Sequence, residues 1–181
     1  MVKNGDAQGY KFTLGGIVNF TCDPGFVLVG ANQAECLSTG HWSTPAPKCQ
    51  VVRCQTPTLR DNILVQPENL QPNVYNSRLT FSCKAGFQLR GSTTIRCLAN
   101  AQWDDVVPIC EAVRCPPLPT PENGGVEVFA FTYGNTATFI CFPGYSLVGH
   151  INSTCQANAT WDHAVSLCRG KCISSISVYM H

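Results

Sequence analysis

The spacing of cysteine and tryptophan residues in this chain of 181 residues repeats three times. A first cysteine stands 14 residues before a second, the second stands 13 residues before a third, and a tryptophan follows the second by six residues. Because recurrence at a fixed period is the mark of repeated structural units, the sequence predicts three small domains of about 60 residues rather than one large domain. The three sets are Cys22, Cys36, Trp42 and Cys49, then Cys83, Cys97, Trp103 and Cys110, then Cys141, Cys155, Trp161 and Cys168.

A domain of this size buries too little apolar surface to be stable without crosslinks. Twelve cysteines in small repeated domains indicate disulfides formed in an oxidising, extracellular compartment. Zinc is the alternative, because Cys49 and Cys54, like Cys110 and Cys115, are close pairs of the kind that structural zinc sites use. Both pairs lie at repeat junctions and no histidine recurs in register, so the sequence favours disulfides and predicts no metal ligand and no cofactor.

Apolar and polar residues alternate on both sides of Cys22, Cys83 and Cys141. Alternation with a period of two is typical of strands that have one buried face. A glycine recurs at a fixed place in the turn after each of these cysteines, which indicates a backbone position with a positive φ. No segment shows the sustained apolar period of a helix. The sequence therefore predicts an all-β chain.

The register of the repeats predicts two cysteines without partners inside the chain. Asn4-Gly5 and Asn123-Gly124 occupy equivalent places, which puts the opening cysteine of the first repeat about five residues before Met1. Cys36 is then expected to be unpaired, while Cys172 opens a further repeat that does not develop or belongs to an unrelated tail. We expect no disulfide between these two, because three domains separate them by more than the ~7 Å that a disulfide spans.

The repeats share more than their cysteines and tryptophans. Asn-Gly occurs in repeats one and three, followed by Phe-x-Leu-Gly at 12–15 and Phe-x-Tyr-Gly at 131–134. The next cysteine then begins the pattern Cys-x-x-Gly-aromatic-x-Leu-x-Gly, and a tryptophan precedes the last cysteine. This combination closely resembles the sushi family, also called complement control protein modules, over residues 1–168.

The resemblance implies small antiparallel β modules arranged end to end as an elongated rod. The modules cover residues 1–49, which lack the first cysteine, 54–110 and 115–168, with linkers at 50–53 and 111–114 and a remainder at 169–181. The residues alone leave three connectivities for each module of four cysteines. The family implies pairing of the first cysteine with the third and of the second with the fourth. Carried over, this gives Cys54–Cys97, Cys83–Cys110, Cys115–Cys155 and Cys141–Cys168, with Cys22–Cys49 in the first module.

A few positions depart from the pattern. In the second repeat Asn76 replaces the glycine of the Phe-x-aromatic-Gly signal, and it can stand in for glycine because asparagine tolerates the left-handed region. Ala101 stands where the first repeat has Gly40. In the third repeat Ser166 replaces Pro47 and Pro108 of the other two. These differences do not change the predicted fold, but they leave the shapes of the loops undetermined.

Tandem sushi modules imply extracellular protein–protein interaction, most often in complement regulation, cell-surface adhesion or receptor function. A CUB-and-sushi chain or a complement regulator is a plausible parent, either secreted or anchored in a membrane, since this chain begins without a signal peptide. The expected partner is an extracellular protein, such as an activated complement fragment. A structural spacer in a larger extracellular protein and ligand binding like that of cytokine receptors are the alternatives.

Composition and motifs argue against other classes of function. No catalytic motif is present, so the sequence predicts no enzyme and no catalytic residue. A net charge of +1 gives no general attraction to nucleic acid, and no stretch is long and apolar enough to insert into a bilayer. Residues 115–168 contain no lysine or arginine, which argues against glycosaminoglycan binding there.

Three further kinds of site residue follow from the sequence. Sequons predict glycosylation at Asn19, Asn152 and Asn158. Identical placement in all repeats predicts that Trp42, Trp103 and Trp161 are core residues next to the disulfides. The second repeat has no sequon and holds most of the positive charge inside the modules. We therefore expect its accessible protein-binding face to include Arg90 and Arg96.

Overall fold

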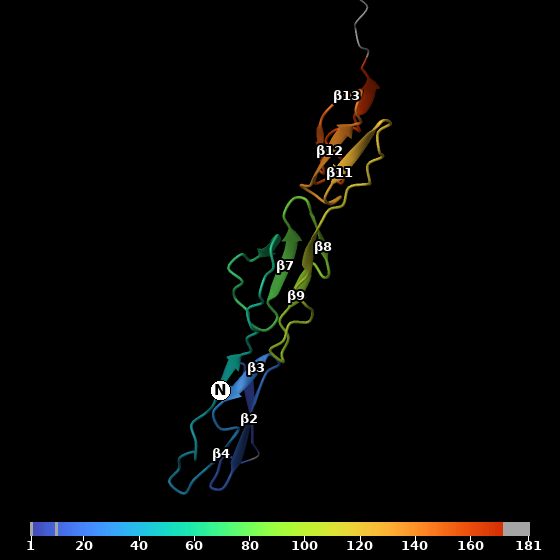
Figure 1. The fold of residues 1–181 in the computed structure, drawn as a ribbon. Coiled ribbons are helices and arrows are strands. Elements are labelled where there is room, and N and C mark those ends of the chain that lie inside the picture. The colour runs from blue at the N-terminus through green and yellow to red at the C-terminus, as the bar shows by residue number, and fades with distance from the viewer. Residues whose placement is uncertain (1, 10, 172–181) are drawn as a thin grey trace, which may run out of the picture. The chain divides into compact units, whose positions relative to one another are not determined.

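The computed structural model describes residues 2–9 and 11–171, and every regular element in them is a β-strand (Figure 1). This confirms the all-β fold class predicted from the sequence. No helix in this part of the chain could cross a membrane. Cys172, which was predicted to open a further repeat, lies outside the described residues.

Each repeat contributes five short strands. The first repeat holds β1 (Gly5–Gly9), β2 (Ile17–Cys22), β3 (Phe26–Val29), β4 (Gln33–Glu35) and β5 (Lys48–Val51). The second holds β6 (Ile63–Gln66), β7 (Arg78–Cys83), β8 (Phe87–Arg90), β9 (Thr94–Arg96) and β10 (Ile109–Ala112). The third holds β11 (Gly124–Val128), β12 (Thr136–Cys141), β13 (Tyr145–Val148), β14 (Asn152–Thr154) and β15 (Leu167–Gly170).

The same topology occurs in all three repeats. Three strands form one sheet, in the orders β1-β2-β4, β6-β7-β9 and β11-β12-β14, and the remaining two pair as β3-β5, β8-β10 and β13-β15. In the three-stranded sheets, inward-facing residues of neighbouring strands lie opposite each other. Leu79 of β7 and Ile95 of β9, which are each 1% exposed, are an example. Because successive side chains of a strand point to opposite faces, this register places one layer of apolar residues in each core.

Five disulfides crosslink the described part of the chain. They join Cys22 to Cys49, Cys54 to Cys97, Cys83 to Cys110, Cys115 to Cys155 and Cys141 to Cys168. Cys97 and Cys155 are fully buried, so these disulfides are part of the cores. Among the described residues Cys36 is the free cysteine, and its side chain is half-buried.

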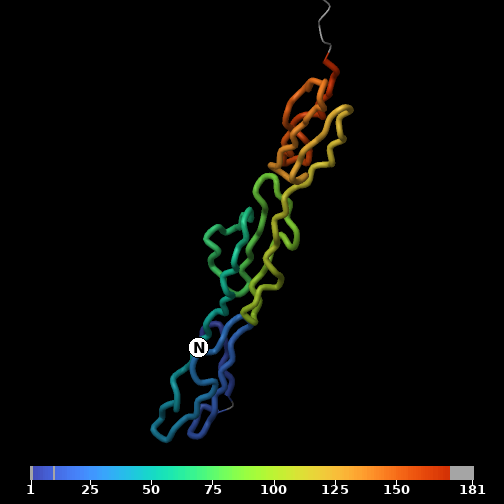
Figure 2. Tube along the Cα trace, viewed as in Figure 1, coloured from blue at the N-terminus to red at the C-terminus, as the bar shows by residue number. Residues whose placement is uncertain are grey.

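The chain divides into two compact units, and the division runs through the second repeat. Unit one comprises Met1–Ser82 and Arg90–Ile109, and unit two comprises Cys83–Leu89 and Cys110–His181. The trace in Figure 2 lets the reader follow how the chain leaves unit one after β7 and returns to it before β9. Each unit therefore contains one of the two linkers together with the residues that hold it.

In unit one the first linker is fixed by backbone hydrogen bonds. The N–H of Val52 donates to the carbonyl of Gly25 over 2.8 Å, and the N–H of Tyr75 donates to the carbonyl of Val52 over 2.8 Å. Val52 is buried, with 5% of its surface exposed. The ring of Tyr75 lies on Gly25, where a Cβ would stand 1.9 Å from the Cδ1 atom of the ring. The linker is therefore an ordered part of the unit rather than an exposed loop.

Unit two repeats this arrangement around the second linker. The N–H of Val113 donates to the carbonyl of Gly86 over 2.9 Å, and the N–H of Tyr133 donates to the carbonyl of Val113 over 2.8 Å. Tyr133 also packs edge-on against Phe87, with ring centroids 6.0 Å apart. We call the two arrangements, Gly25–Val52–Tyr75 and Gly86–Val113–Tyr133, the linker clasps.

Candidate protein-binding surface

The tryptophans do not lie in the cores, which corrects the prediction from their repeated placement. Trp42 is 41% exposed, and Trp103 and Trp161 are half-buried. A core one side chain deep is filled by residues such as Leu79 and Phe139, so a bulky indole is left at its margin. The tryptophans are therefore edge residues that keep one side toward solvent.

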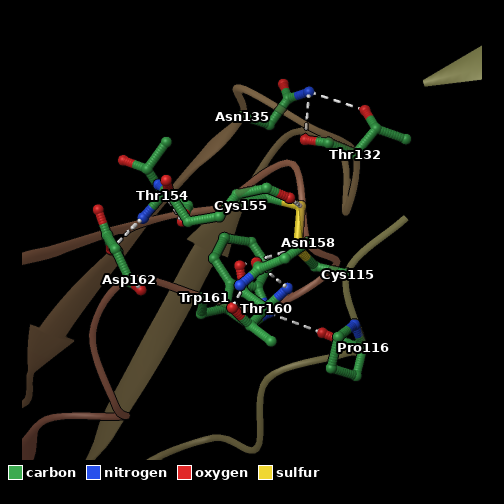
Figure 3. The surroundings of a disulfide bond; sticks show 12 residues. Cys115, Pro116, Thr132, Asn135, Thr154, Cys155, Asn158, Thr160, Trp161 and Asp162 are labelled. Atoms are coloured by element: carbon green, nitrogen blue, oxygen red, sulfur yellow. Dashed lines mark hydrogen bonds between the residues drawn. A yellow bond between two sulfur atoms is a disulfide. The ribbon is translucent and has the colours of Figure 1, made fainter. Parts of the chain in front are cut away.

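The indoles of repeats two and three nevertheless lie beside disulfides, as the family resemblance implies. Trp161 forms a backbone bridge with Cys155, and its Nε1–H donates to the carbonyl of Pro116 over 2.8 Å, next to Cys115 (Figure 3). In the second repeat, the Nε1–H of Trp103 donates to the carbonyl next to Cys54 over 2.8 Å. Each of these hydrogen bonds thus joins the segment that follows the opening cysteine to the tryptophan near the end of the same repeat.

The two arginines predicted to share a binding face lie on different sheets. Arg96 is on β9, where its cross-strand neighbour is Arg78 and its Nε lies 3.8 Å from a carboxylate oxygen of Asp104. Arg90 ends β8, which pairs with β10. The ion pair of Arg96 is solvent-exposed and therefore contributes little to stability. Arg96 lies opposite Arg78 in the sheet, and a binding face that contains Arg90 and Arg96 stays a prediction.

The three sequon asparagines are all exposed. Asn19 lies on β2, the central strand of its sheet, and Asn152 begins β14. Asn158 lies in the turn after Cys155, where its side-chain oxygen accepts a hydrogen bond of 2.6 Å from the hydroxyl of Thr160 (Figure 3). Each side chain is therefore accessible to a glycan, although glycosylation itself stays a prediction.

Unit one contains a groove of about 740 Å³ where the hairpin of the first repeat meets a loop of the second. The alternation of β3 turns Phe26 and Leu28 inward, which leaves Val27 and Val29 on the outer face with 54% and 46% of their surfaces exposed. The groove is lined by Val27, Val29, Gln50, Val51, Val52, Arg53, Ala99, Asn100 and Ala101.

The chemistry of this groove suits an extended peptide of another protein. Its floor is apolar, two amide side chains lie along it, and the exposed guanidinium of Arg53 stands at its edge. The register of the hairpin adds a second cation, because Lys48 lies opposite Val29. No acidic residue lines the groove. Exposed apolar surface with a polar rim marks protein interaction sites, and the two cations favour a partner with acidic side chains.

Sequence reasoning missed this groove because two repeats form it together. The signal available in the sequence was the pair Val27 and Val29, two apolar residues at outward positions of a predicted strand. The loop 99–101 gave no signal, because its position next to the hairpin depends on the first linker clasp. The predicted binding face in the second repeat was placed at Arg90 and Arg96, and neither residue lines the groove.

Comparison with known proteins identifies the family. A family model described as "Sushi repeat (SCR repeat)" matches residues 1–49, 54–110 and 115–168. The chain belongs to the sushi-repeat family. This confirms the resemblance drawn from the cysteine and tryptophan pattern. Both the family and the adhesion-type relatives that follow support a role in extracellular protein interaction or adhesion.

Several larger proteins contain a similar segment. The chain is 35% identical over 166 residues to "Sushi, von Willebrand factor type A, EGF and pentraxin domain-containing protein 1" of Rattus norvegicus, covering 92% of this chain and 5% of that protein. It is 36% identical over 164 residues to P-selectin of Rattus norvegicus, covering 84% and 20%. It is 33% identical over 173 residues to E-selectin of Homo sapiens, covering 92% and 28%. This chain thus spans only 5 to 28% of the length of these relatives.

Proposed function

We propose that this chain is an extracellular recognition segment that binds a cell-surface protein through the groove of unit one. The observation that carries the proposal is the exposed pair Val27 and Val29 beside the cation of Arg53. A site with an apolar floor and a charged rim binds by burying the partner's apolar side chains, while the charges set its orientation.

The position of the sequons supports the use of this groove. Asn19 lies on the sheet β1-β2-β4, whereas the groove uses the hairpin β3-β5. The second repeat, which supplies the loop 99–101, has no sequon. None of the predicted glycosylation sites is a residue that lines the groove.

Adhesion and complement regulation are the two finer roles for such a segment. The selectin relatives favour adhesion at a cell surface, and nothing in the groove is specific for a complement fragment. We therefore propose adhesion as the role of the chain. A spacer role predicts no ligand at all, which the same experiment tests.

Introducing negative charge into the groove should weaken binding of the partner. In the full chain, Val27→Glu combined with Val29→Glu should weaken binding at least about tenfold, since truncation of a hot-spot residue costs more than about 1 kcal/mol. The measurement is binding of the immobilised chain to intact cells and, in parallel, to purified activated complement fragments. Val106→Glu is the matched control, because Val106 is also an apolar residue of unit one, is 75% exposed and lies outside the groove lining.

The outcomes separate the candidate roles, provided that all variants have the thermal stability of the parent chain. Binding to complement fragments alone contradicts the adhesion role and supports complement regulation. Binding to cells that survives both groove substitutions, but is lost in Arg90→Glu with Arg96→Glu, places the contact on the second repeat instead. An absence of binding to either target supports the spacer.

A further inference from the structure

Two arginines stand opposite each other on the outer face of the three-stranded sheet of the second repeat. Arg78 is on β7 and Arg96 is on β9, which lie side by side in Figure 1, and the two residues are register partners. Both side chains are exposed, whereas their neighbours Leu79 and Ile95 point into the core. The two guanidinium groups therefore rise from the same face of the sheet.

The backbone hydrogen bonds of Arg96 place the two side chains as close together as a sheet allows. The N–H of Arg96 donates to a carboxylate oxygen of Asp104 over 2.7 Å, and the N–H of Asp104 donates to the carbonyl of Arg96 over 2.9 Å. Arg96 thus directs both backbone groups away from β7. Arg78 and Arg96 therefore form a non-hydrogen-bonded pair, in which the side chains of an antiparallel sheet stand closest, with Cβ atoms about 4.5–5.5 Å apart.

The charges of this pair are only partly balanced inside the molecule. Like charges directly opposite each other in a sheet are destabilising. A carboxylate oxygen of Asp104 lies 3.8 Å from the Nε of Arg96, whereas Arg78 forms no ion pair within the described part of the chain. Two guanidinium groups and one carboxylate leave a surplus of one positive charge. An anion that reaches both guanidinium groups would relieve their repulsion.

The second repeat is the one that carries cations at these positions. In the first repeat the equivalent register partners are Ile17 and Glu35, and in the third they are Thr136 and Thr154. The strand order of the sheet is the same in all three repeats. The fold therefore does not require an arginine at either position, and the pair has to be explained by something other than the architecture.

The arginines border a hollow of about 310 Å³, which is lined by Arg78, Thr94, Ile95, Arg96 and Asp104. The one apolar side chain of this lining is Ile95, which is 1% exposed. Protein partners bind chiefly by inserting apolar and aromatic side chains into dry pockets, and this hollow offers them no exposed apolar surface. None of its residues lines the groove of unit one, so the two are separate sites.

We propose that Arg78 and Arg96 bind the sulfate groups of a glycan chain. A guanidinium presents its N–H groups as a planar fork that suits oxyanions. A sulfate ester is tetrahedral and has three free oxygens, which can serve two forks at once, whereas a carboxylate has two oxygens in one plane. The hydroxyl of Thr94 supplies a further polar group for the sugar. The proposal does not depend on the adhesive function proposed for the groove.

Binding of the full chain to immobilised heparin, a sulfated polysaccharide, tests the proposal. The measurement is surface plasmon resonance at an ionic strength of about 0.1 M, where exposed charges more than about 10 Å apart are largely screened. Arg78→Gln with Arg96→Gln should weaken binding at least about tenfold, since a hydrogen bond to a charged group is worth a factor of about ten or more. Arg60→Gln with Lys84→Gln is the matched control, because it removes two other exposed cations of the second repeat and should leave the affinity nearly unchanged.

Two more variants separate a shaped site from a general attraction between charges. Arg78→Lys with Arg96→Lys keeps both charges but removes the planar forks, so the affinity should fall. Asp104→Asn keeps an oxygen for the N–H of Arg96 while it removes the neighbouring negative charge, so the affinity should rise. Heparin that has been stripped of its sulfate groups but keeps its carboxylates should not bind.

Four results would overturn the proposal, given variants that unfold at the same temperature as the parent chain. The first is an absence of binding to heparin. The second is an equal loss of affinity when Arg60 and Lys84 are neutralised, which would mean that total charge rather than a site decides binding. The third is binding to desulfated heparin as tight as to heparin. The fourth is a preference for vesicles that contain phosphatidylserine, which would place the anion on a membrane.

Discussion

Removing the Cys115–Cys155 disulfide should unfold the third repeat at physiological temperature. This crosslink joins residues 40 apart, and closing a loop of that length is worth about 4 kcal/mol in the chain-entropy model. Whole domains are stable by only about 5–15 kcal/mol, and a repeat of this size lies at the low end of that range. The double substitution Cys115→Ala with Cys155→Ala should therefore remove most of the free energy of unfolding of this repeat.

Cleavage by chymotrypsin after Phe139 measures this loss. Phe139 is 1% exposed in the folded repeat, so it becomes a substrate only when the repeat opens. Cys36→Ser is the control, since it removes a thiol that forms no disulfide and should leave the cleavage rate unchanged. Resistance of the double variant equal to that of the parent chain would contradict the prediction.

Replacing Gly25 by alanine should open the first linker clasp. Gly25 has a φ of 85°, which costs an alanine about 1–2 kcal/mol. The new Cβ would also collide with the ring of Tyr75, at its Cδ1 and Cγ atoms. Overpacking of this kind adds about 1–3 kcal/mol, so the total cost is roughly 2–5 kcal/mol. The ring has to move away from the linker, which weakens the contact that orders Val52.

The readout is tryptic cleavage after Arg53, which should become faster in Gly25→Ala. The bond after Arg53 is protected in the folded chain because the N–H of Cys54 donates to the carbonyl of Asn73 and Arg53 forms a bridge with Val74. No described disulfide joins residues on the two sides of this bond, so the cleavage products separate without reduction.

The third repeat supplies a matched control for Gly25→Ala. Gly144 occupies the equivalent position with a φ of 89°, and a Cβ placed there meets nothing within 4 Å. Gly144→Ala therefore carries the backbone strain without the collision, and cleavage after Arg53 should stay at the parent rate. If cleavage after Arg53 is no faster in Gly25→Ala than in Gly144→Ala, the ring of Tyr75 does not hold the linker.

Much of the fold was predictable because its signals are local. The alternation before Cys83 predicts β7, and the chemistry of asparagine predicts that Asn76 replaces a glycine. In the structure Asn76 has a φ of 67°, close to the 74° of Gly15 and the 81° of Gly134. A period of two and a tolerance for positive φ are properties of single residues, so one sequence is enough to reveal them.

The sites were less predictable because they depend on contacts between distant residues. The groove needs the loop 99–101 beside Val27, which stands about 70 residues earlier in the sequence. The tryptophans were misplaced for a related reason. Regular placement shows that a residue serves the same purpose in each repeat, but it does not show how much of the side chain the small core can cover.

The pairing of the disulfides limits how far a complete repeat can be stretched. From Cys54 the crosslink leads to Cys97, and only the 13 residues from there to Cys110 remain free to extend, out of 56 along the chain. At about 3.5 Å for each extended residue, that is about 45 Å instead of about 195 Å. The third repeat follows the same rule through Cys155 and Cys168. Under mechanical load, such repeats therefore yield little length even after their sheets have come apart.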